Sequence, residues 1–241
     1  MKVIVCVRSA LAPGERAALA LAAGLGGDVK VLALAAGDAG CDAALRACLA
    51  AGAGYVARLE GDALASADFH TLGRALAAAV RHLGGDLVLT GERSIDEGLG
   101  AITGSLAHHL DARQVARIEA LAADAETQPA SESDRTAGAA AVTVIVRGGG
   151  LKRRLRVPLP AVLSVSDRVM SPSLPTPSSV PSVSPVEREI RVLSLTDVGL
   201  DPGLIRRRDV LLGTLELAPR PATVTGSADA FARALRPPST Y

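Results

Sequence analysis

The sequence predicts an α/β fold with three layers, in which helices cover both faces of a mostly parallel sheet. A β-hairpin and an extended C-terminal arm are added to this core. Three observations support this prediction. Apolar runs alternate with amphipathic helical stretches through the first half of the 241 residues, and this order produces right-handed crossovers between parallel strands. The apolar runs are nearly unbroken, which fits strands buried on both faces. In the second half, Gly148–Gly150 separates two strand-like runs, as in a hairpin.

The individual elements follow from local signals. Pro13 lies near the start of the first expected helix and Gly24 near its end, while Gly84 and Gly85 end the third. We expect strands at Val3–Val7, Val29–Ala35, Tyr55–Leu59, Asp86–Thr90, Ala141–Arg147, Lys152–Val157, Ala161–Val165 and Glu187–Leu195. We expect helices at Glu15–Gly24, Asp42–Ala51, Asp68–Leu83, Ala101–Leu110 and Ala228–Leu235.

Two segments have the composition of connections. Thr127–Gly138 is polar and predicts a turn or a hairpin tip. Ser171–Pro185 contains five prolines and six serines, a composition that a packed element does not tolerate. We therefore expect an exposed, extended segment there.

Composition and charge exclude several classes of function. The formal net charge is only +1 and aromatic residues make up 2% of the chain, so neither long-range attraction nor stacking favours nucleic acid. The three cysteines Cys6, Cys41 and Cys48 form no CxxC pair, which favours a reducing compartment. The longest uncharged apolar run is too short to cross a membrane, and Arg8 interrupts the only signal-like start. We therefore expect a cytoplasmic protein that begins at Met1.

The motifs of common catalytic sites are absent from the sequence. It contains no GxSxG elbow, no GxxxxGK[ST] loop and no HExxH pair. Gly98 and Gly100 superficially resemble a dinucleotide fingerprint, but they follow the fourth expected strand and Thr103 replaces the third glycine. The histidines lack ligand spacing. We expect no catalytic residue and no metal site.

The most informative stretch is Leu87–Leu110, where a short strand leads through a glycine-rich turn into a helix. Such a turn and helix N-terminus present unpaired N–H groups that suit a phosphate. We expect Gly91 and Asp96 to shape the loop, and Gly98, Gly100 and Thr103 to approach the phosphate.

The order of several motifs resembles the β subunit of electron-transfer flavoproteins. The matching segments are VIVCVR at 3–8, PGERAAL at 13–19, ALRACLAAGA at 44–53, LTGERSID at 89–96, LPAVLS at 159–164 and PSLP at 172–175. The resemblance implies an adenine-nucleotide α-hydrolase-like fold. Its nucleotide-binding domain would span 1–186, with a partner-docking loop at 171–186, and the final strand and arm at 187–241 would pack on a partner subunit.

The resemblance also implies a function without bond-making chemistry of its own. The chain would pair with an α subunit that carries FAD, accept electrons from flavin dehydrogenases and deliver them to an acceptor such as a membrane quinone reductase. In this subunit the nucleotide would be AMP or a second FAD, or the site would be empty. The implied partner-docking residue is Leu174, and the cofactor-binding residues are Cys6, Pro13, Gly37, Gly91, Ser94, Asp96, Gly98, Gly100 and Thr103.

Departures from the resembling family keep two alternatives open. Where that family's phosphate loop usually reads Asp-x-Asp-Thr-x-Gln-x-Gly, this chain has DEGLGAIT at 96–103. Its Asn-Pro-aromatic motif is Ala12-Pro13-Gly14 here. One alternative is therefore a scaffold subunit that has lost its nucleotide. The other is a stand-alone adenine-nucleotide-binding regulatory domain.

Overall fold

The computed structural model describes residues 1–64, 67–93, 100–123, 140–169 and 189–205, and all of these belong to one compact unit. The sequence predictions outside these ranges include the Thr127–Gly138 connection, the Ser171–Pro185 segment and the helix at Ala228–Leu235. None of the helices in the described ranges combines the length and the apolar character needed to span a membrane.

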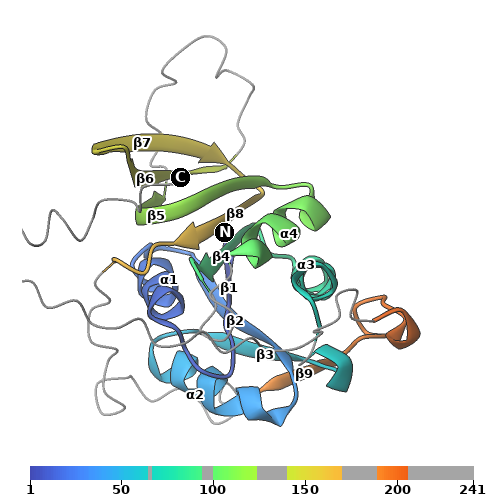
Figure 1. Ribbon diagram of the computed structural model, residues 1–241. Helices are drawn as coiled ribbons and strands as arrows, with labels where there is room; N and C mark the ends of the chain where they lie inside the picture. Colours follow the sequence, from blue (N-terminus) through green and yellow to red (C-terminus); the bar gives the residue numbers. More distant parts are fainter. Residues whose placement is uncertain (65–66, 94–99, 124–139, 170–188, 206–241) are drawn as a thin grey trace, which may run out of the picture. The chain divides into compact units, whose positions relative to one another are not determined.

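A nine-stranded, mostly parallel sheet forms the centre of this unit (Figure 1). Its spatial order is β7-β6-β5-β8-β4-β1-β2-β3-β9, and only the β5–β6 and β6–β7 pairs are antiparallel. The strands are β1 (Lys2–Cys6), β2 (Lys30–Gly37), β3 (Tyr55–Glu60), β4 (Leu87–Gly91), β5 (Arg113–Ala123), β6 (Ala141–Gly148), β7 (Leu151–Pro158), β8 (Ala161–Val165) and β9 (Arg191–Ser194). The predicted parallel α/β fold is confirmed.

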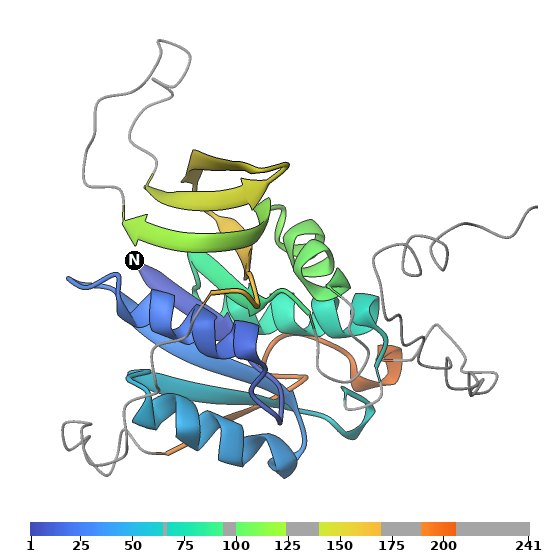
Figure 2. The same cartoon turned by 60° about the vertical axis from the view of Figure 1, so that its left-hand side comes forward.

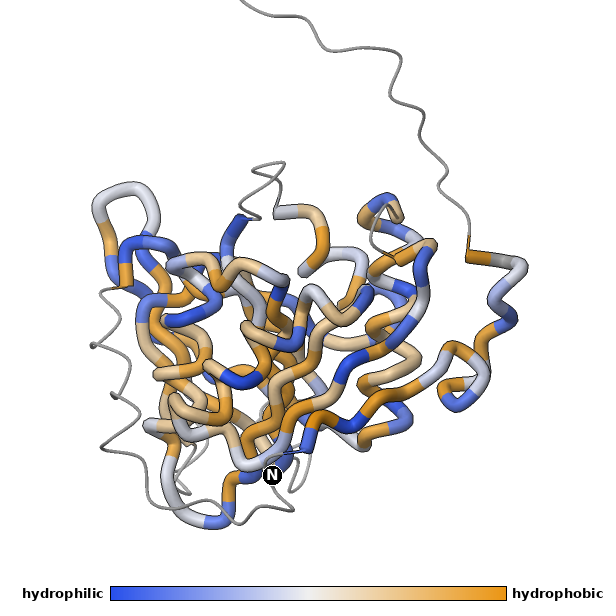
Figure 3. Tube along the Cα trace, turned by 90° about the horizontal axis from the view of Figure 1, so that it is seen from below, coloured by the Kyte–Doolittle hydropathy of each residue, from blue (hydrophilic) through white to orange (hydrophobic). Residues whose placement is uncertain are grey.

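In the described part of the chain, four α-helices cover the two faces of the sheet, as the sequence predicts for these segments. They are α1 (Pro13–Ala23), α2 (Asp42–Ala50), α3 (Phe69–Leu83) and α4 (Ala101–Leu110), with 3₁₀ turns η1 (Ala39–Cys41), η2 (Asp62–Leu64) and η6 (Pro202–Leu204). One buried cluster joins α1 and α2 to strand residues such as Val3 and Val5, and a second joins α3 and α4 to Ile4. Side chains alternate between faces along a strand, so the sheet divides two hydrophobic cores. Figure 2 shows α1 and α2 in front of the sheet, and in Figure 3 hydrophobic segments, coloured orange, run through the middle of the described part of the chain.

The helix boundaries agree closely with the sequence signals. At the start of α3, the Asp68 carboxylate accepts a hydrogen bond of 2.7 Å from the Thr71 N–H, and Gly84 closes the helix with φ of 68°. Both are standard ways of satisfying the free backbone groups at helix ends. Helix α1 begins earlier than expected, at Pro13, because proline is well suited to the first helical position.

Among the strands in the described ranges, β5 is the one that the sequence signals do not predict. Strand β5 runs from Arg113 to Ala123 and pairs in parallel with β8 and antiparallel with β6. Its sequence, RQVARIEALAA, is rich in alanine, which favours helices and weakens the alternation that marks a strand. A register shift between Val115 and Ile118 further disturbs that alternation.

The contact between α3 and α4 depends on a glycine. A methyl group at Gly73 would lie 2.6 Å from the Ser105 Cβ and 2.1 Å from its Oγ. We expect Gly73→Ala to lower the free energy of unfolding by about 1–3 kcal/mol, because the two helices must separate. Adding Ser105→Gly should restore most of the loss, as measured by urea denaturation. A fully stable Gly73→Ala variant would contradict this close helix contact.

Candidate functional site

The topology creates a crevice at the carboxyl ends of the central strands. Strand β1 lies between β2 and β4, and the chain continues outward from β2 to β3 before returning to the other side of β1 as β4. Connections therefore leave β1 and β4 toward opposite edges of the sheet. In open α/β sheets, ligands bind outside the strand ends at such a switch point.

A cavity of about 190 Å³ lies at these strand ends. Its polar side combines the cations Arg8 and Arg93 with the acids Glu15 and Asp38. Its apolar side comes from η2, α3 and α4 and includes Phe69, a residue that is 51% exposed. The full lining is Cys6, Val7, Arg8, Ser9, Glu15, Ala36, Gly37, Asp38, Cys41, Leu64, Ala67, Phe69, Leu72, Leu76, Thr90, Gly91, Arg93 and Ile102.

The structure brings three of the sequence-predicted residues together in this cavity: Cys6 at the end of β1, Gly37 at the end of β2 and Gly91 at the end of β4. Gly37 has φ of 143° and an added Cβ would lie 3.4 Å from the Cys41 sulfur, so this turn requires glycine. Pro13, at the first position of α1, and Gly100, which precedes α4, are not among the lining residues.

Four predicted residues cannot be placed. Ser94, Asp96 and Gly98 of the predicted phosphate loop lie outside the described residues, as does the predicted docking residue Leu174. Their roles stay predictions.

Thr103 faces the protein interior. It is 1% exposed, and its hydroxyl lies 2.8 Å from the Thr90 hydroxyl. This pair of hydroxyls ties the first turn of α4 to the end of β4. The proposed phosphate contact of Thr103 stays a prediction, and in this structure its hydrogen-bonding partner is Thr90.

Cys6 and Cys41 line the cavity as neutral, apolar side chains. Burial, with repulsion from the Glu15 carboxylate, raises the pKa of the Cys6 thiol to about 12. Burial also raises the pKa of Cys41, with Asp38 adding to the effect. A thiol is reactive only as its thiolate, so Cys6 is a poor nucleophile at neutral pH.

Glu92 joins the elements that meet at the end of β4. One of its carboxylate oxygens lies 2.9 Å from the Arg117 Nε, and the other accepts a hydrogen bond of 3.2 Å from the Asp167 N–H. An added Cβ on Gly14 would lie 3.0 Å from the Glu92 nitrogen, and one on Gly100 would lie 2.7 Å from the Glu92 carbonyl oxygen. The starts of α1 and α4 therefore both pack against the Glu92 backbone.

Arg117 reaches Glu92 from an irregular backbone. It lies within the register shift of β5, has φ of 62°, and donates its N–H to the Ser164 Oγ at 3.0 Å. A positive φ is uncommon for a residue with a side chain, and a bulge redirects the side chain that carries it. Here the redirected guanidinium meets Glu92.

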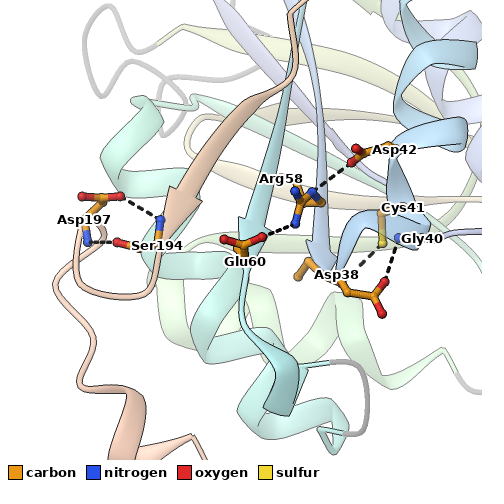
Figure 4. A network of polar contacts seen from close by, with 9 residues as sticks. Asp38, Gly40, Cys41, Asp42, Arg58, Glu60, Ser194 and Asp197 are labelled. Carbon is orange, nitrogen blue, oxygen red and sulfur yellow. Dashed lines mark hydrogen bonds and ion pairs between the residues drawn. The ribbon is translucent and has the colours of Figure 1, made fainter.

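A second ionic network supports the turn between β2 and α2 (Figure 4). Arg58 on β3 lies 2.9 Å from Asp42 at the start of α2 and 2.8 Å from Glu60. Asp38 closes the same turn by accepting the Gly40 N–H at 2.8 Å, and the Cys41 thiol faces the Ala36 carbonyl at 3.9 Å. The network therefore lies behind the cavity wall that Asp38 and Cys41 form.

Four charged lining residues were missing from the predicted set: Arg8, Glu15, Asp38 and Arg93. The sequence signal for three of them is present, because Arg8, Asp38 and Arg93 closely follow the ends of β1, β2 and β4, where ligands of parallel sheets bind. Glu15 becomes part of the cavity because α1 packs against the end of β4.

Comparison with known proteins places these features in a wider context. The family model described as "Electron transfer flavoprotein domain" matches residues 3–192. The chain is 27% identical to an electron transfer flavoprotein subunit beta of Methylophilus methylotrophus over 173 residues, which are 72% of this chain and 61% of that protein. It is 26% identical to the subunit of the same name in Mycobacterium tuberculosis over 204 residues, which are 84% of this chain and 70% of that protein.

Proposed function

Because the chain belongs to the electron transfer flavoprotein family, as a divergent β-type member, we propose that it is the nucleotide-binding subunit of a two-subunit electron carrier. Its partner is an α subunit that holds FAD. The pair accepts electrons from flavin dehydrogenases and passes them to a downstream acceptor. The observation that carries this proposal is the cavity at the switch point of the sheet, in a chain whose family match spans residues 3–192.

The lining of the cavity fits one adenine mononucleotide. Phe69 offers an exposed ring face on which a purine can stack, Asp38 offers a carboxylate for ribose hydroxyls, and Arg8 and Arg93 offer cations for a phosphate. We propose AMP rather than a second FAD as the ligand, because the lining offers one aromatic ring and one pair of cations.

None of the described lining residues suggests bond-making chemistry. The Cys6 thiol is held neutral by burial, and hydrogen bonds position the two acids: Glu15 accepts the Ala12 N–H at 3.0 Å and Asp38 accepts the Gly40 N–H at 2.8 Å. The role of this chain is therefore to bind the nucleotide and to support its partner. The redox chemistry is that of the flavin in the complex, which accepts and donates electrons.

The proposal is tested by co-expression with candidate α subunits, capture through a tag on this chain, and extraction of the cofactors. We expect a yellow heterodimer that contains one FAD and one AMP. A yellow heterodimer without AMP would indicate a scaffold subunit that has lost its nucleotide. A colourless monomer that binds AMP or ATP would indicate a stand-alone regulatory domain, and the carrier function would be wrong.

A further inference from the structure

The N-terminus of α1 is closed to an anionic ligand. Glu15 lies in the first turn of this helix, is buried, and accepts a hydrogen bond of 3.0 Å from the Ala12 N–H. Glu15 is also one of the residues that line the cavity. A carboxylate at this place neutralises the positive end of the helix dipole and repels a phosphate. The anionic part of a ligand must therefore bind at another wall of the cavity.

Arg93 lies on the wall that continues from β4. It follows Gly91 by two residues, lines the cavity, and its side chain is 59% exposed. Its Nε lies 3.3 Å from the Asp167 Oδ2. A guanidinium has five N–H donors in a planar fork, so a contact through Nε leaves the two terminal NH₂ groups able to grip a phosphate in a bidentate manner.

Neighbouring residues hold the chain around Arg93 in place. Asp167, which orients the guanidinium, is itself linked to Glu92 through its N–H at 3.2 Å. Glu92 is linked in turn to Arg117 on β5 at 2.9 Å. Glu92, which precedes Arg93, and Asp167, which faces it, therefore belong to one connected cluster. Two ion pairs and one hydrogen bond in this cluster join β4, β5 and the turn after β8.

We propose that Arg93 binds the phosphate of the nucleotide, and that Asp167 orients its guanidinium for this contact. This assignment rests on the proposed function, because it requires a nucleotide in the cavity. Arg93 then discriminates between a nucleotide and a nucleoside: the phosphate gains two charge-assisted hydrogen bonds, while the base and ribose bind through other residues.

The test compares AMP with adenosine by isothermal titration calorimetry, using the full chain after removal of bound nucleotide with charcoal. We expect the unmodified chain to bind AMP at least tenfold more tightly than adenosine. Arg93→Gln should lower the affinity for AMP about tenfold to a hundredfold and leave that for adenosine within twofold. Arg93→Lys, which keeps a point charge without the planar fork, should fall between the two.

Arg46→Gln is the matched control, because Arg46 is an exposed residue of α2 that does not line the cavity. It makes the same change of charge and should leave both affinities unchanged. An unaltered AMP affinity in Arg93→Gln would overturn the assignment alone, and so would an equal loss for AMP and adenosine. If the unmodified chain binds neither compound, the proposed nucleotide site is wrong and the assignment fails with it.

Discussion

Replacing Arg58 with methionine is expected to lower the free energy of unfolding by about 3 kcal/mol, since breaking a buried ion pair typically costs about 3–5 kcal/mol. The Arg58 side chain is only 7% exposed and Asp42 is 22% exposed, so methionine leaves the Asp42 carboxylate without its partner in a partly buried site. We expect a value at the lower end of the range because Asp42 begins α2, where the helix dipole stabilises a negative charge. Urea denaturation monitored by far-UV circular dichroism measures the loss.

Glu60→Gln provides the control for this prediction. Glu60 also contacts Arg58, at 2.8 Å, but its side chain is 55% exposed. Exposed ion pairs contribute roughly 0–1 kcal/mol, so this variant should lose less than 1 kcal/mol. Asp42→Asn should lose more than Glu60→Gln, and the Arg58→Met/Asp42→Asn double variant should lose less than the sum of its single changes. Equal losses for the two acid variants would show that burial does not determine the strength of the network.

The Arg58→Met variant is also expected to affect the wall of the cavity. Asp42 directly follows the turn in which Asp38 accepts the Gly40 N–H and the Cys41 sulfur lies 3.4 Å from where a Gly37 Cβ would be. Arg58 holds the start of α2 against β3, so its loss loosens the support of the wall formed by Asp38 and Cys41 (Figure 4). If Arg58→Met weakens nucleotide binding, the affinities for AMP and adenosine should therefore fall equally. In Arg93→Gln, by contrast, only the affinity for AMP should fall.

Local signals predicted most of the fold. Asp68 and Gly84 mark the ends of α3 in the sequence as they do in the structure, because the capping interactions depend on residues close in the chain. The hairpin of β6 and β7 was recognised from its glycines, two of which have positive φ. The failure at β5 has a physical cause: Ala116, Ala120 and Ala122 carry little strand preference, and long-range pairing with β6 and β8 determines the conformation.

The candidate site was predictable only where it follows from strand ends. Cys6, Gly37 and Gly91 meet because parallel strands place their carboxyl ends at one edge. The ionic cluster of Glu92, Arg117 and Asp167 joins residues up to 75 positions apart. No periodicity records such a contact, since it arises from the order of β4, β8 and β5 in the sheet.

Gly100→Ala is expected to weaken both the fold and the nucleotide site. The backbone at Gly100 has φ of −95°, which alanine accepts, so the obstacle is space. An added Cβ would lie 2.7 Å from the Glu92 carbonyl oxygen, a backbone atom that cannot rotate away. The start of α4 must then move away from the end of β4, at a cost of about 1–3 kcal/mol of unfolding free energy. Because Arg93 directly follows Glu92, we also expect at least a tenfold loss of AMP affinity.

Gly104→Ala on the same helix separates crowding from helix propensity. Its added Cβ would meet nothing closer than the Gln114 side-chain amide at 3.7 Å, which is ordinary contact. Alanine stabilises a helix relative to glycine by roughly 1 kcal/mol, so this variant should be as stable as the unmodified chain or more so, with unchanged AMP affinity. If Gly100→Ala is as stable as the unmodified chain, the start of α4 does not depend on a close approach to Glu92. If its AMP affinity is also unchanged, the junction of β4 and α4 plays no part in holding the nucleotide.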